Sequence, residues 1–291
     1  MMIVKNIIDL SKVRLTISVV FSAVAGYFIA SKSFVLIDFS LLLAGGFLVV
    51  AASNGFNQII ERQYDKLMTR TSQRPLPSNR MSAKEAYIIS LIMLCAGVYL
   101  LFKINLLCGF FGFLSVLLYV LVYTPLKRIS SISVLVGAFP GAIPFLLGWI
   151  AVTNELNIEA LILFSIQFIW QFPHFWAIAW VCDKDYRIAG FKMLPGKKEK
   201  STAWKIVLYT FFLIPLSILP YFSISGSLSI SIFSLILILI LGLWFFSKAY
   251  ILLSDLSDNS AKKLMFASFI YLPSIQLIFI LDKILCVLIL N

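Results

Sequence analysis

Charged side chains are scarce in this 291-residue chain: they make up 13% of it, whereas hydrophobic residues make up 61%. Soluble globular proteins average about a quarter charged residues, so the composition excludes an ordinary water-soluble domain. Long hydrophilic segments are also missing, and nothing in the sequence separates one part from another. We therefore expect a single membrane-embedded domain over residues 1–291.

Cysteine and histidine are sparse as well. The four cysteines are scattered, mostly within apolar segments, and they form no CxxC or CxxCH pair. Zinc, iron–sulfur and covalently attached haem sites of the usual spacing are therefore unsupported, and we expect the cysteines to pack as small apolar residues. His174 is the only histidine in the chain.

Apolar segments long enough to cross a membrane, by contrast, occur nine times. A spanning helix needs about 20 mostly apolar residues, and the continuous rather than alternating pattern favours helices over a β-barrel. The first segment lacks a small-residue cleavage site, so we expect a retained helix and not a signal peptide. The predicted fold class is an all-α polytopic membrane protein with helices at 14–31, 39–60, 86–102, 105–123, 132–152, 158–181, 204–222, 228–247 and 264–281.

The net charge of +11 is distributed asymmetrically. If the N-terminus is cytoplasmic, 21 of the 24 Lys and Arg residues fall on the cytoplasmic side, and the exceptions are Lys32, Lys103 and Lys283. This is the positive-inside pattern of membrane proteins. It predicts a cytoplasmic N-terminus and a C-terminus on the opposite side, and it explains the basic residues without nucleic acid as a partner.

Two polar loops, at 61–85 and 182–203, follow the second and sixth predicted helices on the cytoplasmic side. Their four-helix separation suggests two structurally related halves followed by an extra ninth helix. The fifth predicted helix carries Gly137, Gly141 and Gly148 together with two prolines. Small residues of this kind allow membrane helices to approach closely, so we expect tight packing there.

The second predicted helix ends in a polar stripe. Asn57, Glu61 and Asp65 are spaced i, i+4, i+8, so they lie on one helix face. Carboxylate and amide oxygens are suitable Mg²⁺ ligands, and Mg²⁺ in turn binds diphosphate. We expect this motif at an exposed helix end, where a solvated end with internal ion pairs is the alternative interpretation. Guanidinium groups that match phosphate oxygens follow at Arg62, Arg70 and Arg74.

The second polar loop supplies another pair of carboxylates, Asp183 and Asp185. Opposite the first motif in an antiparallel bundle, they predict a second metal-binding side around one diphosphate, whose leaving-group charge the metal would stabilise. The loop between the fourth and fifth predicted helices adds Lys127 and Arg128 on the same side. These two residues are either phosphate contacts or part of the positive-inside flank.

His174 lies near the middle of the sixth predicted helix, within an aromatic segment. Gln167, Gln171 and His174 are spaced i, i+4, i+7 and are expected to share a face that continues to Asp185, about 16 Å further along the helix. Imidazole is a common axial ligand of haem iron, and the flanking aromatic rings suit a flat macrocycle. The alternative is a structural histidine hydrogen-bonded to a neighbouring helix.

Together these motifs resemble the UbiA superfamily of intramembrane prenyltransferases. Asn57-x3-Glu61-x3-Asp65 is similar to the Asn/Asp-rich motif after the second helix of that superfamily, with Glu61 in place of the usual central Asp. The Asp183/Asp185 pair is similar to its second Asp motif. The resemblance covers essentially the whole chain.

One branch of the superfamily, whose members act on haem, is the most similar. The matching stretches are WQFPHFW at 170–176, DKDYR at 183–187 and AGFKMLP at 189–195. Phe172 and Lys192 depart from the usual PPHFW and GxPMLP patterns, but neither replaces a carboxylate or the histidine.

The resemblance implies a UbiA-type helical bundle that transfers a farnesyl group from farnesyl diphosphate to a vinyl group of haem B, with addition of water, giving haem O and diphosphate. It implies a bacterial inner membrane, with the lipid bilayer as surroundings and a haem A synthase or terminal oxidase downstream. It also implies Mg²⁺ held by Asn57, Glu61, Asp65, Asp183 and Asp185, diphosphate contacts from Arg62, Arg70, Arg74, Lys127 and Arg128, and haem contacts from His174 and Gln171.

Two other functions are open at this point. One is a UbiA-type prenyltransferase acting on a quinone precursor; the solitary mid-membrane imidazole argues against it, because a small aromatic acid needs no iron ligand. The other is a membrane transporter. Transporters place their substrate sites near the midplane, whereas the acidic residues here gather at one membrane face.

Overall fold

The structure, a computed structural model, describes residues 2–223 and 228–290. Within these ranges it contains helices and no strand, and nine segments are long and apolar enough to cross a membrane. The predicted all-α fold class and the number of spans are confirmed. The elements are α1 (Met2–Ser11), α2 (Val13–Ala30), α3 (Leu36–Asp65), α4 (Ala83–Ile104), α5 (Leu106–Leu117), η1 (Leu118–Tyr123), α6 (Thr124–Leu126), α7 (Ser133–Thr153), α8 (Ile158–Val181), α9 (Asp183–Ile188), α10 (Lys200–Ile218), η2 (Leu219–Phe222), α11 (Ile232–Asp255) and α12 (Asp258–Leu290).

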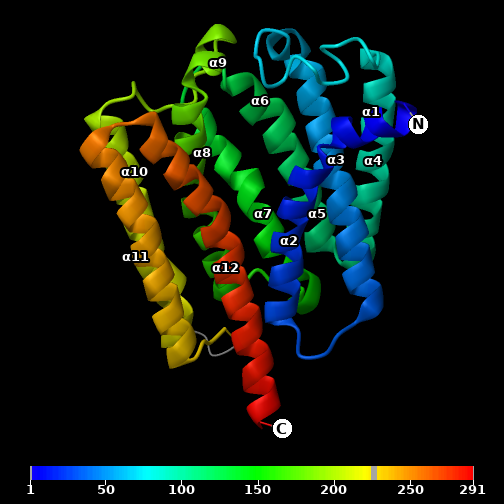
Figure 1. Cartoon of the computed structure of the whole chain (residues 1–291). Coiled ribbons are helices and arrows are strands. Elements are labelled where there is room, and N and C mark those ends of the chain that lie inside the picture. The colour runs from blue at the N-terminus through cyan, green and yellow to red at the C-terminus, as the bar shows by residue number, and fades with distance from the viewer. Residues whose placement is uncertain (1, 224–227, 291) are drawn as a thin grey trace.

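The spanning helices form one bundle of roughly antiparallel neighbours (Figure 1). Successive helices pack together along the chain, and α12 closes the arrangement by packing against both α2 and α8. The bundle centres on α7, which contacts α2, α5 and α8 and buries most of its residues. The connections that carry the polar loops, including α9, lie at the same end of the bundle as α1, and α12 ends at the opposite end.

The helices α4 and α5, which correspond to the closest pair of predicted spans, are separated in the structure by a single residue. Asn105 has an extended backbone (φ −165°, ψ 169°) between α4 and α5. Its side-chain oxygen accepts the Cys108 N–H at 2.8 Å, and its amide donates to the Ile150 carbonyl at 2.9 Å. The side chain therefore begins one helix and attaches the turn to α7.

Several helices are longer than their apolar segments. α3 continues to Asp65 and α12 begins at Asp258, because hydropathy marks the membrane-embedded part of a helix and not its polar ends. The predicted span at 228–247 begins later, at Ile232, because Ser231 is extended and its hydroxyl caps α11 by accepting the Ser234 N–H. The extension of α3 places the whole first motif on one regular helix.

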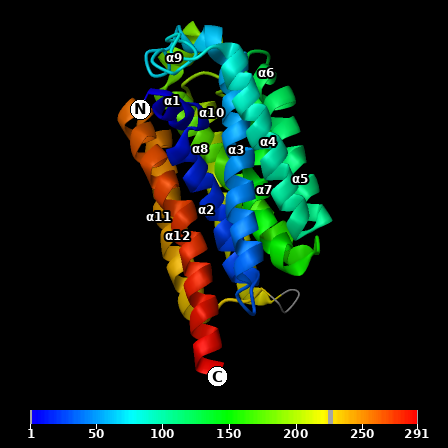
Figure 2. The same ribbon diagram turned by 90° about the vertical axis from the view of Figure 1, so that its right-hand side faces the viewer.

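The N-terminal tail contains a helix that the sequence interpretation missed. α1 lies across the end of the bundle and packs against α3 (Figure 2). Its inner side buries Asn6 and Leu10, whereas Ile3, Val4 and Ile8 are exposed. Lys12 then adopts a left-handed conformation (φ 46°) that turns the chain from α1 into α2.

Glycine allows the predicted close helix approach at α7. A Cβ atom on Gly148 would lie 2.0 Å from the Ala23 carbonyl oxygen of α2. On the α2 side, a Cβ atom on Gly26 would lie 2.3 Å from the Phe145 carbonyl oxygen. The two backbones therefore cross in direct contact, and this fixes α2 and the adjoining Lys12 relative to the centre of the bundle.

Candidate active site

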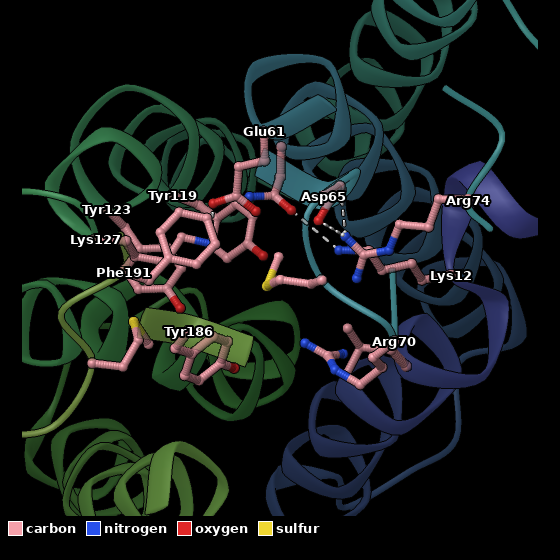
Figure 3. A pocket seen from close by; sticks show the side chains of 14 residues that line it. Lys12, Glu61, Asp65, Arg70, Arg74, Tyr119, Tyr123, Lys127, Tyr186 and Phe191 are labelled. Carbon is pink, nitrogen blue, oxygen red and sulfur yellow. Dashed lines mark hydrogen bonds and ion pairs between the residues drawn. The ribbon is translucent and has the colours of Figure 1, made fainter. Parts of the chain in front are cut away.

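A cavity of about 380 Å³ lies where α3, η1 and the segment after α8 meet the junction of α1 and α2. It is at the end of the bundle that carries α1 and α9. In Figure 3, aromatic rings and Lys127 occupy one side and the other cationic groups the opposite side. The lining residues are Lys12, Leu15, Asn57, Glu61, Asp65, Met68, Arg70, Arg74, Tyr119, Tyr123, Lys127, Tyr186, Phe191 and Met193.

Asp65 is completely buried at the last turn of α3. The expectation that the first motif ends at an exposed helix terminus is therefore wrong for this residue. The chain after α3 folds back over the helix end: the Thr71 hydroxyl donates to the Asp65 carbonyl at 2.9 Å. From the same segment, Arg74 Nη1 donates to both Asp65 carboxylate oxygens, at 2.9 and 2.8 Å.

Glu61, one turn earlier on α3, forms an ion pair with Lys127. Both side chains are buried, and the Lys127 ammonium also lies 4.9 Å from the centre of the Tyr123 ring and 5.3 Å from that of Phe191. Burial disfavours the charged ammonium, but the Glu61 carboxylate outweighs it, so the pKa of Lys127 is raised. Lys127 therefore keeps its positive charge within the cavity.

Asn57 is oriented by two partners. Its amide nitrogen donates to the Thr124 hydroxyl at 3.2 Å, and Lys12 Nζ donates to its amide oxygen at 3.2 Å. Burial, followed by the nearby Arg74 charge, lowers the pKa of Lys12 to about 7, although the Glu61 carboxylate opposes this shift. An added anion in the cavity would stabilise the charged form of Lys12.

The second carboxylate motif lies on α9, beside the cavity rather than in its lining. Asp183 pairs with Arg187 at 3.0 Å, one turn further along this short helix. Tyr186, which follows Asp185 on α9, does line the cavity, and so does Phe191 in the segment after α9. Gly190, in the left-handed region (φ 73°), turns the chain so that the Phe191 N–H donates to the Tyr186 carbonyl at 2.8 Å.

This turn is attached to the connection after α6, because the Lys192 N–H donates to the Lys127 carbonyl at 2.7 Å. The two polar loops meet at the cavity, because Arg70 of the first and Tyr186 of the second both line it and the Phe191 ring lies 6.0 Å from that of Tyr64 at the end of α3. The structure places Asp183 and Asp185 outside the residues that line the cavity, and their role as metal ligands stays a prediction.

The five predicted diphosphate contacts separate into two groups. Arg70, Arg74 and Lys127 line the cavity. Arg62 is directed elsewhere and donates to the Ile59 carbonyl at 2.6 Å. Arg128 lies over the Tyr64 ring, 4.2 Å from its centre, and donates to the Tyr64 hydroxyl.

Sequence reasoning assigned no site role to Lys12, Tyr119, Tyr123 or Phe191, all of which line the cavity. For Tyr119 and Tyr123 the sequence does contain a usable pattern. Together with Lys127 they repeat the four-residue spacing of the acidic motif. Lys12 carries no comparable signal, because one lysine before an apolar segment is an ordinary topology residue.

The predicted shared face of α8 is divided between two neighbouring helices. Gln167 and Gln171 donate to the Gly141 and Ala138 carbonyls of α7, at 2.8 and 2.9 Å. His174 instead contacts α12, through Nδ1 and the Ser268 hydroxyl at 2.8 Å. The three residues belong to the one continuous helix α8, but the face predicted from their spacing lies at the junction of two helices, so the glutamines and the histidine contact different neighbours. The face also stops at Val181, where α8 ends before Asp185.

The cavity suits a divalent cation that is completed by a substrate. Among the described residues no three carboxylate, imidazole or thiol groups gather at one point. The cavity offers two carboxylates and one amide oxygen, each of which already faces a side-chain cation. Mg²⁺ is commonly held by one or two carboxylates together with substrate phosphates and water. Asn57, Glu61 and Asp65 fit that requirement.

The sequence profile of the UbiA prenyltransferase family matches residues 19–270. The chain therefore belongs to the UbiA prenyltransferase family, and the predicted resemblance is confirmed. Within this family, the chain is 50% identical to a protein of Flavobacterium psychrophilum named protoheme IX farnesyltransferase, over 95% of this chain and 94% of that protein. It is 48% identical to a protein of Christiangramia forsetii with the same name, over 94% and 92% of the two chains.

Solved structures agree on the fold. A structure of a digeranylgeranylglyceryl phosphate synthase matches with a TM-score of 0.81 at 24% identity and covers 98% of this chain and 99% of its own. A UbiA homologue from Archaeoglobus fulgidus bound to GPP and Mg²⁺ matches with a TM-score of 0.71 at 17% identity and covers 94% and 99%. The bundle is thus a UbiA-type fold.

Proposed function

We propose that this membrane prenyltransferase transfers a farnesyl group from farnesyl diphosphate to a vinyl group of protohaem IX (haem B). The observation that carries the proposal is the cavity, where two carboxylates and an amide face four cationic side chains beside a set of aromatic rings. The chain is 50% and 48% identical, over nearly its full length, to two proteins named protoheme IX farnesyltransferase, which supports farnesyl diphosphate and haem as the two substrates. The products would be haem O and diphosphate.

The cationic residues would bind the diphosphate. Lys12, Arg70, Arg74 and Lys127 come from three separate parts of the chain (the junction of α1 and α2, the segment after α3 and the connection after α6) and border one cavity. Arginine forks and lysine ammonium groups are the common protein partners of phosphate oxygens. As the diphosphate enters, Arg74 and Lys127 can shift part of their interaction from Asp65 and Glu61 to the phosphates. The freed carboxylate oxygens then become available to Mg²⁺.

Asn57, Glu61 and Asp65 would hold the Mg²⁺. When bound, the ion would neutralise charge that develops on the departing diphosphate. The chain's own cations assist as the allylic carbon–oxygen bond breaks and its electron pair leaves with the diphosphate. The ring faces of Tyr123 and Phe191, which already lie against the Lys127 ammonium, are suited to the resulting allylic cation, and the Tyr119 ring packs beside that of Tyr123.

Carbon–carbon bond formation would follow at the haem vinyl group. The vinyl π electrons attack the allylic carbon, and the cation left on the former vinyl group takes up water, which then loses a proton. His174 is proposed as the haem iron ligand or orienting group. Gln171 donates to the Ala138 carbonyl of α7. It would support the haem site by holding α8 against α7.

The cellular setting extends the proposal. The chain is a multi-pass membrane protein, and the positive-inside distribution supports a cytoplasmic location of the cavity. The similarity to proteins of Flavobacterium psychrophilum and Christiangramia forsetii supports a bacterial inner membrane. Diphosphate would then enter from the cytoplasm. Haem O would leave within the bilayer, toward a haem A synthase or a terminal oxidase.

The test is a reaction with the purified protein in nanodiscs. Haem B and farnesyl diphosphate with Mg²⁺ should yield a farnesylated, hydrated haem by mass spectrometry. 4-Hydroxybenzoate in place of haem should yield no product. Product from the benzoate and none from haem would replace this proposal with the quinone-precursor function.

The histidine gives a second test of the acceptor. His174→Ala should abolish the histidine-ligated haem absorbance and reduce farnesyl transfer on the order of 100-fold, while farnesyl diphosphate binding stays within about twofold. The matched variant Gln167→Ala, which removes a buried amide of the same helix that donates to the Gly141 carbonyl, should leave the haem band in place. An unchanged band in a folded His174→Ala protein would remove the iron-ligand role.

A further inference from the structure

Ser268 of α12 lies against His174 in a way that specifies the state of the imidazole ring. The serine side chain is fully buried, and His174 is 8% exposed. Their side chains meet at His174 Nδ1 and Ser268 Oγ, 2.8 Å apart. This distance alone does not say which group donates, because a neutral imidazole has one N–H and one lone pair.

A second hydrogen bond settles the direction. Ser268 Oγ donates to the Met265 carbonyl, one turn earlier on α12, at 2.6 Å. A serine hydroxyl has one proton, and a bond of this kind is common for serines within helices. If the proton pointed to His174 instead, two oxygen atoms would face each other across 2.6 Å with only lone pairs between them. The hydroxyl therefore accepts from His174, and Nδ1 carries the ring proton.

The orientation of the ring is fixed as well. Trp170 stacks on the imidazole, with ring centres 4.3 Å apart and planes 18° apart. The Trp170 indole N–H donates to the Ser268 backbone carbonyl at 3.0 Å. Phe269 packs against the ring edge-on, at 5.0 Å. Residue 268 thus holds both the ring and the side chain that stacks on it.

We propose that Ser268 is the positioning residue that keeps His174 in the Nδ1–H tautomer and presents the Nε2 lone pair to the iron of an iron porphyrin. Among the described residues, Nε2 has no hydrogen-bond partner. An imidazole that ligates a metal through one nitrogen usually donates from the other to a fixed acceptor, which sets its tautomer and orientation. The inference rests on haem being the acceptor substrate, but the tautomer exists without haem and is measurable without it.

The single histidine makes the first measurement direct. Protein labelled with ¹⁵N-histidine and purified with a tag that contains no histidine gives one imidazole spin system. Long-range ¹H–¹⁵N correlation spectra of the haem-free protein in nanodiscs should show a protonated Nδ1 and an unprotonated Nε2. A protonated Nε2 with a bare Nδ1 overturns the proposal.

Variants at residue 268 test the positioning role. Ser268→Ala removes the hydroxyl but keeps the backbone carbonyl that binds Trp170, so the ring should populate both tautomers. Ser268→Thr restores a hydroxyl and should restore the wild-type spectrum. Ser217→Ala is the matched control, because it removes another fully buried hydroxyl, which bonds Tyr271 of α12 at 3.0 Å, and it should leave the imidazole signals unchanged. A wild-type tautomer in folded Ser268→Ala overturns the role of Ser268.

Haem titration tests the ligand atom. Ser268→Ala should weaken haem B binding on the order of tenfold and leave the affinity for metal-free protoporphyrin IX unchanged, since that macrocycle has no iron to ligate. Equal losses for the two porphyrins would show a packing effect and overturn the proposal. Farnesyl transfer by the wild type is measured separately, so failure of the enzyme activity remains distinguishable from failure of the tautomer assignment.

Discussion

Asp65 illustrates how one buried carboxylate connects the metal and diphosphate functions of the cavity. It has no exposed surface and receives two hydrogen bonds from Arg74. Replacing it therefore removes a metal ligand and also releases an arginine. Asparagine preserves the volume and one oxygen, so it separates charge from packing.

We expect Asp65→Asn to lower farnesyl transfer by at least 100-fold, a typical effect of losing one transition-state charge partner, and to weaken the dependence of the rate on Mg²⁺. The measurement is product formation over a Mg²⁺ series, with thermal unfolding as the check on folding. Asp258→Asn is the control, since Asp258 pairs with Lys198 at an exposed site. Near-normal turnover by Asp65→Asn at saturating Mg²⁺ would end the metal assignment.

Breaking the buried ion pair between Glu61 and Lys127 is expected to lower the free energy of unfolding. Lys127→Met should leave a buried carboxylate without its cation and destabilise the protein by about 3 to 5 kcal/mol. The double variant Glu61→Gln with Lys127→Met should recover much of that loss, because no unpaired charge remains. Unfolding in detergent measures both.

Lys198→Met provides the comparison for this pair. It breaks an ion pair whose Asp258 side chain is 68% exposed, and such pairs contribute about 1 kcal/mol or less. Equal losses for Lys127→Met and Lys198→Met would mean that water screens the cavity pair.

At the scale of the helix, the crossing of α2 and α7 depends on glycine. A methyl group at residue 148 would meet the Ala23 carbonyl oxygen at 2.0 Å and the Tyr27 nitrogen at 2.5 Å. Both atoms belong to the backbone, so relief requires the helices to separate. Separation would also move Lys12, which adjoins α2, away from Asn57.

We therefore expect Gly148→Ala to destabilise the protein by about 1 to 3 kcal/mol, the usual cost of overpacking, and to weaken farnesyl diphosphate binding. Gly46→Ala is the matched variant, because its nearest neighbour would be a Val20 methyl group at 4.0 Å. Alanine there should be neutral or stabilising by up to about 1 kcal/mol. Thermal unfolding of both variants checks the prediction, and a stable Gly148→Ala would contradict the tight crossing.

For the whole molecule, the number of spans determines where the chain ends lie. The described residues contain nine candidate spans, and α1 and the end of α12 lie at opposite ends of the bundle. With the N-terminus in the cytoplasm, a reporter fused after Asn291 (itself outside the described residues) should be on the opposite side. A reporter fused after Leu256, between α11 and α12, should be cytoplasmic. Both reporters on one side would show that α12 does not cross the membrane.

The membrane-spanning character, the number of spans and the acidic stripe on α3 followed from the sequence by itself. Each depends on local properties: an apolar segment must cross hydrocarbon as a helix, and a four-residue spacing places Asn57, Glu61 and Asp65 on one face. Cap residues such as Asn105 act on the backbone beside them, so the helix boundaries are locally encoded too.

Only the tertiary structure decided which side chains meet. Lys12 reaches Asn57 across 45 residues of sequence, and Lys127 reaches Glu61 from another helix. Arg62 and Arg128 lie outside the cavity lining, and His174 contacts Ser268, 94 residues away, whereas the glutamines of its own helix contact α7. The physical reason is that the packing of neighbouring helices decides which of them a given face meets, and helical spacing contains no information about the neighbour.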